Sequence, residues 1–177
     1  MNVKLKMDCA RCCGLCCVVP PFDADQGFGF DKPAHTACRN LTGDLRCSIH
    51  RELEIRGFPA CAAFDCYGAG PWITQALFSG ASWQSSPEIA QRMFALYPRY
   101  RALHELMWLL ELAIGQVTPT DAEPLLRCLR DIQDHCERGA DRVETLDVNV
   151  LRREVRAALR GLARAARMTP TTFAAPD

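Results

Sequence analysis

The chain has 177 residues, about half of them apolar, and its formal net charge is zero. This length fits one domain or two small ones, and the apolar content excludes wholesale disorder. The zero net charge argues against a global attraction to nucleic acid or anionic membranes, although it leaves room for a local charged patch.

Residues 1–8 contain two lysines but no apolar run long enough for a signal peptide. The longest apolar stretch, 103–114, contains three polar or charged residues and is shorter than the roughly 20 residues that span a bilayer. We therefore expect a cytoplasmic protein that does not enter the membrane. In such a reducing compartment, clustered cysteines are more often metal ligands than disulfides.

Five of the nine residues in 9–17 are cysteine, and four more cysteines follow before residue 67. Thiolates are soft ligands that suit zinc, copper(I) and iron–sulfur clusters. A disulfide framework is the alternative, but the odd total of eleven would leave one thiol unpaired. With the one histidine that follows a cysteine by three positions, the candidate metal ligands are Cys9, Cys12, Cys13, Cys16, Cys17, Cys38, Cys47, His50, Cys61 and Cys66.

The spacing inside 9–17 predicts tight chelating turns. Cys9-x2-Cys12 and Cys13-x2-Cys16 each have the two-residue gap of a zinc knuckle or an iron–sulfur loop, and Gly14 suits a turn with positive φ. Neighbouring cysteines point in different directions, so they serve either two metals or one metal and the core. The spacing leaves open which sulfurs share a site.

The remaining candidates lie in a segment with few periodic apolar positions. We expect 18–22 to be extended and the alternating phenylalanines of 28–30 to form a short strand. The Gly43-Asp44 turn should bring Cys38 and Cys47 together, with His50 either a third ligand, a hydrogen-bond donor to a ligand or a helix-start residue. A short helix is expected over 51–56.

The order of these residues resembles a known family. The runs "CCGLCC", "RCSIH", "GFPAC" and "FDCYGAG" are similar to the cysteine-cluster family of zinc- or iron-chelating proteins. They resemble most closely the N-terminal module of actinobacterial proteins described as pentapeptide-repeat-containing. The resemblance covers about 9–115 and implies a metal-chelating module without established catalytic residues. Tandem repeats are absent here, and Gly-Phe-Pro stands where the family usually has Arg-Pro. A distant similarity to the iron–sulfur region of flagellin lysine methylases keeps iron open.

The second half of the sequence predicts a helical bundle. The breaker 68–71 should separate the cysteine segment from an apolar helix over 72–78. Ser86 caps the next helix, Pro98 breaks or kinks it, and a second helix continues to Ile114. A third helix, capped by Thr120, is expected to reach Gly139. It carries a cysteine, a histidine and a second cysteine that fit core packing better than metal binding: Cys128, His135 and Cys136.

A last helix is expected over 147–167, with an apolar face surrounded by arginines. A basic amphipathic helix can bind nucleic acid, lipid or an acidic partner, and it can equally be the solvated face of a bundle helix. A protein partner is open, and nucleic acid is a weaker possibility through 147–167.

The predicted fold class is therefore mainly α, with an irregular cysteine-rich metal-binding module packed on a helical bundle. We expect the module at 1–70, the bundle at 71–167 and a flexible tail at 168–177. The leading functional hypothesis is a structural or interaction module whose cysteines hold zinc or an iron–sulfur cluster. The alternatives are an iron–sulfur redox protein or enzyme, and a metal chaperone or sensor. No general base or nucleophile stands out, so the sequence does not favour an enzyme.

Overall fold

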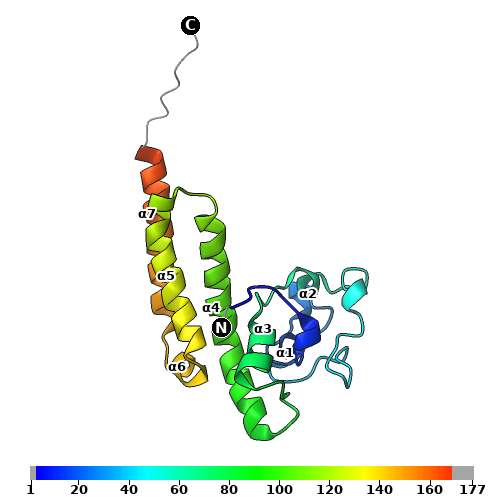
Figure 1. Cartoon of the computed structure of the whole chain (residues 1–177). Coiled ribbons are helices and arrows are strands. Elements are labelled where there is room, and N and C mark those ends of the chain that lie inside the picture. The colour runs from blue at the N-terminus through cyan, green and yellow to red at the C-terminus, as the bar shows by residue number, and fades with distance from the viewer. Residues whose placement is uncertain (1–2, 169–177) are drawn as a thin grey trace.

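The computed structural model describes residues 3–168, and these residues form a mainly α fold, as predicted (Figure 1). The α-helices are α1 (Leu15–Val18), α2 (Pro59–Ala63), α3 (Ala69–Trp72), α4 (Pro87–Ile114), α5 (Pro119–Glu137), α6 (Ala140–Glu144) and α7 (Val148–Met168). Short 3-10 turns, η1 (Cys9–Arg11), η2 (Ala24–Gln26) and η3 (His50–Glu52), and a π-helical turn, η4 (Ile73–Leu77), complete the helical segments.

The three long helices α4, α5 and α7 lie side by side and form the bundle (Figure 1). Their inward positions are fully buried apolar side chains, for example Leu103 on α4 and Ile132 on α5. Helix α7 packs against both neighbours, with Leu151 and Val155 on its buried face. Apolar side chains three to four residues apart lie on one face of each helix, so the bundle buries them together.

Several expected boundaries in the bundle are wrong. Residues 87–114 form one continuous helix through Pro98 instead of two helices. Helix α5 is capped by Thr118, not Thr120, because Pro119 occupies the first helical position and the Asp121 amide donates to the Thr118 hydroxyl. The sequence analysis also missed α6, although its Val143 is fully buried.

The segment 68–71 was expected to interrupt helical structure, but residues 69–71 are helical. Gly68, at φ 79°, precedes α3, which begins at Ala69 and continues directly into η4. The expected helix over 72–78 therefore starts three residues earlier. Helix α3 also runs across the predicted domain boundary at residue 70, and that division stays a prediction.

The segment 9–66 is irregular, as expected, and packs beside the middle of α4 (Figure 1). The strand expected at 28–30 is wrong, since residues 3–168 contain only isolated bridges, between Phe22 and Lys32 and between Leu41 and Cys47. The helix expected over 51–56 is also wrong. The turn η3 is followed by further turns up to Gly57, at φ 81°.

One core joins this segment to the bundle. Leu15, Val18 and Val19 from the cysteine-rich segment belong to the same buried cluster as Met93 and Leu103 of α4. The part of the chain that the structure describes has no helix with the length and apolar character needed to cross a membrane. The predicted tail falls almost entirely in 169–177, outside the described residues.

Candidate functional site

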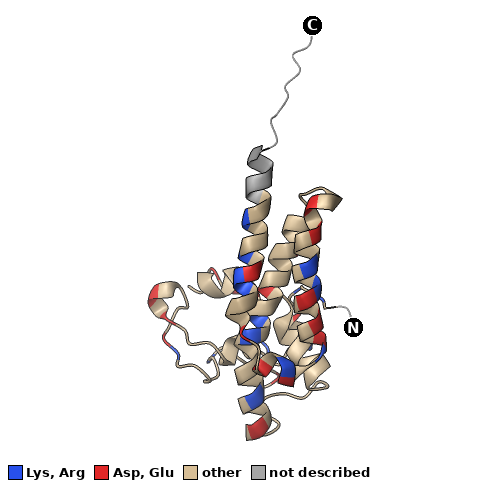
Figure 2. Cartoon of the chain, turned by 90° about the vertical axis from the view of Figure 1, so that its left-hand side faces the viewer, with Lys and Arg blue, Asp and Glu red and all other residues tan. Residues whose placement is uncertain are grey.

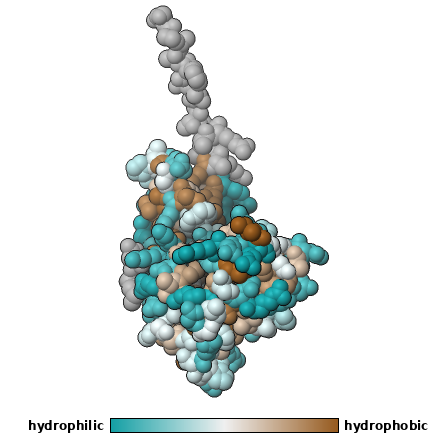
Figure 3. Space-filling view, turned by 90° about the vertical axis from the view of Figure 1, so that its right-hand side faces the viewer, coloured by the Kyte–Doolittle hydropathy of each residue, from teal (hydrophilic) through white to brown (hydrophobic). Residues whose placement is uncertain are grey.

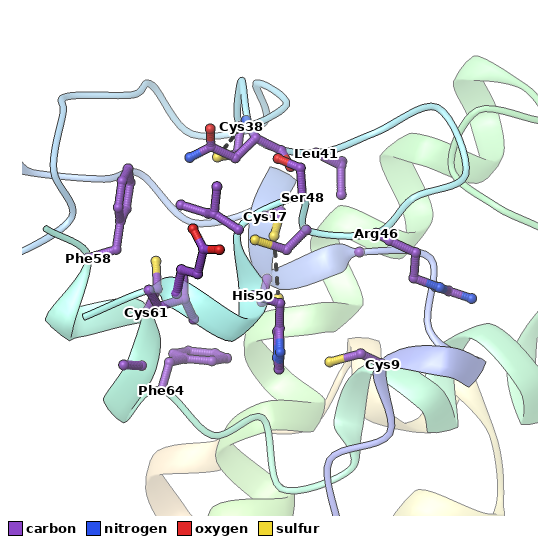
Figure 4. A pocket seen from close by; sticks show the side chains of 18 of the residues that line it. Cys9, Cys17, Cys38, Leu41, Arg46, Ser48, His50, Phe58, Cys61 and Phe64 are labelled. Atoms are coloured by element: carbon purple, nitrogen blue, oxygen red, sulfur yellow. Dashed lines mark hydrogen bonds between the residues drawn. The ribbon is translucent and has the colours of Figure 1, made fainter. Parts of the chain in front are cut away.

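Most of the predicted ligands surround one cavity of about 860 Å³. Figure 4 shows the side chains of Cys9, Cys17, Cys38, Cys61 and His50 around this space. The wall is largely apolar and includes phenylalanine rings from three separate loops. The predicted ligands that line it are Cys9, Cys12, Cys16, Cys17, Cys38, Cys47, His50 and Cys61. The structure thus gathers eight of the ten candidates around a single space.

The N-terminal thiols are presented by two short helical turns. Cys9 begins η1 and Cys12 follows it, while Cys16 and Cys17 belong to α1, where their sulfurs lie 3.8 Å apart. Gly14 precedes α1 with φ 74°, and the position of an added Cβ would lie 2.9 Å from Leu41. This turn therefore favours glycine because of its positive φ, while the Leu41 side chain would have to move to make room for a Cβ.

The Cys38 and Cys47 thiols reach the cavity through a hairpin-like loop, as the turn signal predicted. The backbone of Leu41 bridges to Cys47, and the Thr42 amide and hydroxyl both donate to the Arg46 carbonyl. The loop thereby returns the chain to the cavity next to Cys38.

Arg46 is a functional residue that the sequence analysis missed. Its guanidinium donates from Nη1 to the Cys12 carbonyl and from Nη2 to the Ala10 carbonyl, both at 2.7 Å. Burial and the thiols of Cys66 and Cys17 raise the pKa of Cys9, and the positive charge of Arg46 partly opposes this rise. Arg46 therefore ties the two cysteine loops together. Its position next to Cys47 was the only signal in the sequence.

Lys32 is the second residue that was missed. Its side chain is buried, and Nζ, with three N–H donors, lies 2.7–3.3 Å from four backbone carbonyl oxygens, those of Val18, Pro20, Pro33 and Thr36. Burial lowers the pKa of Lys32, while the Cys38 and Cys17 thiols raise it. The ammonium thus joins the segment 18–20 to the segment 32–36 and places a positive charge beside two candidate ligands.

Two candidate ligands do not line the cavity. Cys13 is buried in the core, where the Thr74 hydroxyl donates to its sulfur at 3.4 Å and Met93 Sδ lies 3.9 Å away. Cys66 is buried beside α3, and its sulfur lies 3.9 Å from the position that a Cβ at Gly70 would occupy.

Six of the seven thiols that line the cavity have a raised pKa, and Cys17 is the exception. Burial raises the pKa of Cys12 to about 12 and that of Cys61 to about 11. The hydrogen bond between Cys16 and Cys17 raises the pKa of Cys16 and lowers that of Cys17. Cys17 is thus the thiol best prepared to act as a thiolate.

All eleven cysteines are free thiols, which gives the disulfide alternative no support. Within residues 3–168, no three or more histidine, cysteine, aspartate or glutamate side chains stand close enough together to hold a metal ion. The cysteines border the cavity without converging on one point. The wall of the cavity is largely apolar, and cysteine is a residue type that zinc and iron–sulfur clusters take as ligand.

The second cysteine and histidine group does not form a site. Cys136 and His135 are buried on α5, and the His135 ring lies 3.8 Å from the Asp131 carboxylate one turn away. Cys128 contacts the edge of the core. This arrangement agrees with the expectation of core packing.

The basic helix keeps its arginines at the surface (Figure 2). Arg153, Arg156 and Arg160 are exposed, while the apolar face of α7 packs into the bundle. The side chains of Arg164 and Arg167 lie outside the described residues. Binding of nucleic acid by 147–167 stays a prediction.

The face that carries the cysteine-rich segment is largely hydrophilic (Figure 3). Its phenylalanine side chains pack instead around the cavity, where Phe22 stacks on Phe28 with ring centroids 4.7 Å apart. Phe58 and Phe64 also line the cavity.

The chain is 39% identical over 159 residues to the uncharacterized protein YybG of Bacillus subtilis. The match covers 88% of this chain and 56% of YybG, so the chain spans about half the length of that relative. No protein-family model matches the chain, and no solved structure matches it. The resemblance to cysteine-cluster proteins stays a prediction.

Proposed function

We propose that this chain is a metal-binding protein whose N-terminal cysteines hold zinc or an iron–sulfur cluster. The observation that carries the proposal is the gathering of seven thiols and His50 around one largely apolar cavity. The largely apolar wall supports the proposal, because the hydrophobic shell of a metal site controls the access of solvent to it. Lys32 and Arg46 supply positive charge beside the sulfurs, as an anionic metal–thiolate centre needs.

In this proposal the metal replaces a conventional core. The segment 9–66 lacks long helices, and its isolated bridges give little stability of their own. Metal binding to a site that is absent in the unfolded chain contributes directly to folding stability. The centre would then fix the cysteine-rich segment against α4. A reducing compartment such as the cytoplasm would keep the thiols available.

A second candidate function is an iron–sulfur redox protein or an enzyme. A closed structural zinc site fills every coordination position with protein and leaves no adjoining space. Here the thiols border a cavity of about 860 Å³, which has room for a substrate beside the metal. The cavity is therefore the feature that favours a redox or catalytic function over a purely structural role.

Anaerobic purification followed by an absorption spectrum and metal analysis tests the proposal. Iron, acid-labile sulfide and a brown colour would identify an iron–sulfur cluster. Colourless protein with stoichiometric zinc would identify a structural site, and substoichiometric metal that a chelator removes at once would favour a chaperone or sensor. Cys17→Ser should lower the metal content, while Cys128→Ser, a thiol outside the cavity, should not. Metal-free wild-type protein that takes up neither zinc nor iron would overturn the proposal.

A further inference from the structure

The cavity beside the thiols is much larger than a bound metal needs. Zinc–sulfur bonds are about 2.3 Å long, so four thiolates enclose a zinc ion and leave no free space between them. The cavity measures about 860 Å³, which falls within the roughly 300–1,000 Å³ that small-molecule sites occupy in proteins. A metal centre at the thiols therefore accounts for only a small part of this space.

Aromatic rings form part of the wall. Phe22, Phe28, Phe58 and Phe64 all line the cavity. Phe22 and Phe58 are buried, and Phe30 packs edge-on against both of them, with ring centroids 6.0 and 5.7 Å away. These contacts hold the rings in place without a ligand, so the apolar wall is already formed.

The two sides of the cavity differ in chemistry. In Figure 4, Phe58, Phe64 and Cys61 lie together on one side of the space, and Arg46 and Cys9 lie on the other. A molecule bound between these sides contacts aromatic rings at one end and thiols along its length. The larger part of its contact with the wall is apolar.

Two arginines and two glutamates line the cavity, so their formal charges cancel. Three of these side chains are exposed to solvent, and the fourth, Arg46, already donates to the Ala10 and Cys12 carbonyls. Moving a charged group out of water without a counter-charge is unfavourable. The lining therefore suits an uncharged molecule. The charged residues that line the cavity are Arg46, Arg51, Glu52 and Glu54.

The turn at 50–55 forms part of the rim of the cavity, and every residue in it lines the cavity. The hydrogen bonds of this turn are local. The Glu52 amide donates to the Ile49 carbonyl and the Phe58 amide donates to the Leu53 carbonyl, both at 2.8 Å. The turn is thus stabilised by its own backbone, and its exposed side chains border the mouth of the cavity.

Two exposed apolar side chains stand at this mouth. Ile55 is 89% exposed, more than any other large apolar side chain that the structure describes, and Met7 is 36% exposed. Both of them line the cavity. Single exposed apolar residues are common on protein surfaces, but covering these two with a bound molecule is favourable because water leaves their surface. They extend the apolar wall outward to solvent.

We propose that the cavity binds an uncharged, largely apolar organic molecule next to the thiols. The aromatic rings surround its inner part, and Ile55 and Met7 cover the part at the mouth. The inference goes beyond metal binding, because it rests on the size and the lining of the cavity and holds whether or not the thiols carry a metal.

Fluorescence titration of the full-length, anaerobically purified protein tests the proposal with two matched compounds. N-phenyl-1-naphthylamine is uncharged and apolar, whereas 8-anilinonaphthalene-1-sulfonate has the same rings and carries a sulfonate. A single molecule of the uncharged compound should bind to each chain and emit at a shorter wavelength than in water. The sulfonate should bind about tenfold more weakly or worse, because its charge would leave water without a counter-charge.

Two matched variants locate the site. Ile55→Glu places a carboxylate at the mouth and should weaken binding of the uncharged compound by about fivefold or more. The Ile55 side chain is exposed, so the substitution leaves the fold intact. Leu112→Glu introduces the same carboxylate at a 50% exposed apolar position on α4 that is not part of the cavity wall, and should leave the affinity unchanged. Circular dichroism checks that both variants fold.

No binding of N-phenyl-1-naphthylamine at micromolar concentrations would overturn the inference, and so would equal affinity for the two compounds. An unchanged affinity in Ile55→Glu, or equal losses in both variants, would refute the site. Metal analysis of the same sample tests the proposed function separately. Protein that holds zinc or iron but does not bind the uncharged compound refutes only this inference, whereas protein that binds the compound and takes up neither metal refutes only the proposed function.

Discussion

His104 should make the folded protein sensitive to acid. The ring is fully buried on α4, and Nδ1 lies 2.8 Å from the Tyr67 carbonyl. A carbonyl oxygen only accepts, so Nδ1 carries the proton of the neutral ring. Nε2 is buried and has no partner among the described residues. Burial lowers the pKa of His104 from 6.5 to about 4, while the Tyr67 hydrogen bond opposes this shift.

The sign and size of the effect follow from these values. The unfolded chain takes up a proton near pH 6.5, whereas the folded protein takes it up only near pH 4. Between these values the unfolded state binds more protons, so stability falls as the pH falls. At 1.36 kcal/mol for each pH unit, the folded protein should lose about 3 kcal/mol across this window. The loss should level off below pH 4.

Urea unfolding of wild-type protein and His104→Asn at several pH values between 7.5 and 4 measures this contribution. The asparagine amide can still donate to the Tyr67 carbonyl but does not titrate, so the variant should show a shallower loss of stability. Groups common to both proteins, including other thiols and carboxylates, cancel in the comparison. Equal pH slopes, or an NMR titration of the His104 ring near pH 6.5, would refute the reasoning.

Further predictions concern Lys32, two helical glycines and a buried thiol. Lys32→Met should lower the free energy of unfolding by about 2–4 kcal/mol in urea titrations, because several carbonyls lose a charged donor; an unchanged midpoint would contradict the role of the ammonium. Gly70→Ala should destabilise the protein by about 1–3 kcal/mol in thermal unfolding, since its Cβ would lie 2.7 Å from the Cys12 sulfur. Gly161→Ala, where an added Cβ meets nothing within 4 Å, should instead stabilise α7 by up to about 1 kcal/mol, and a loss in both would argue against a local clash. Burial raises the pKa of Cys136 to about 12, so the folded state keeps a proton that the unfolded chain releases above pH ~8.5. Stability should therefore fall from pH 8.5 upward, by about 1 kcal/mol at pH 9.5, and Cys136→Ala should lose less over that range in urea unfolding; parallel curves would count against this.

The sequence predicted the helical bundle well where local signals were strong. Ser86 and Pro87 mark the start of α4, and the Ser86 hydroxyl accepts from the Ile89 amide as a cap should. The sequence wrongly predicted that the helix would end or kink at Pro98. Proline disfavours a helix interior, yet the buried residues on both sides of it, Leu96 and Tyr100 among them, keep α4 continuous. Tertiary packing therefore overcame a local preference.

By itself the sequence determined that cysteines gather before residue 67, that the Gly43-Asp44 turn returns Cys47 toward Cys38, and that helices form the rest. These are properties of composition, turn residues and apolar spacing, which act over a few positions. Only the tertiary structure decided that Cys13 enters the core, that Cys66 lies against Gly70, and that Lys32 and Arg46 hold the cysteine loops. Each of these contacts joins residues that are distant in the chain or that lie in irregular loops. The spacing of residues in the sequence does not set the distance between two irregular loops. The polar backbone groups of these loops pair with groups that lie far away in the sequence.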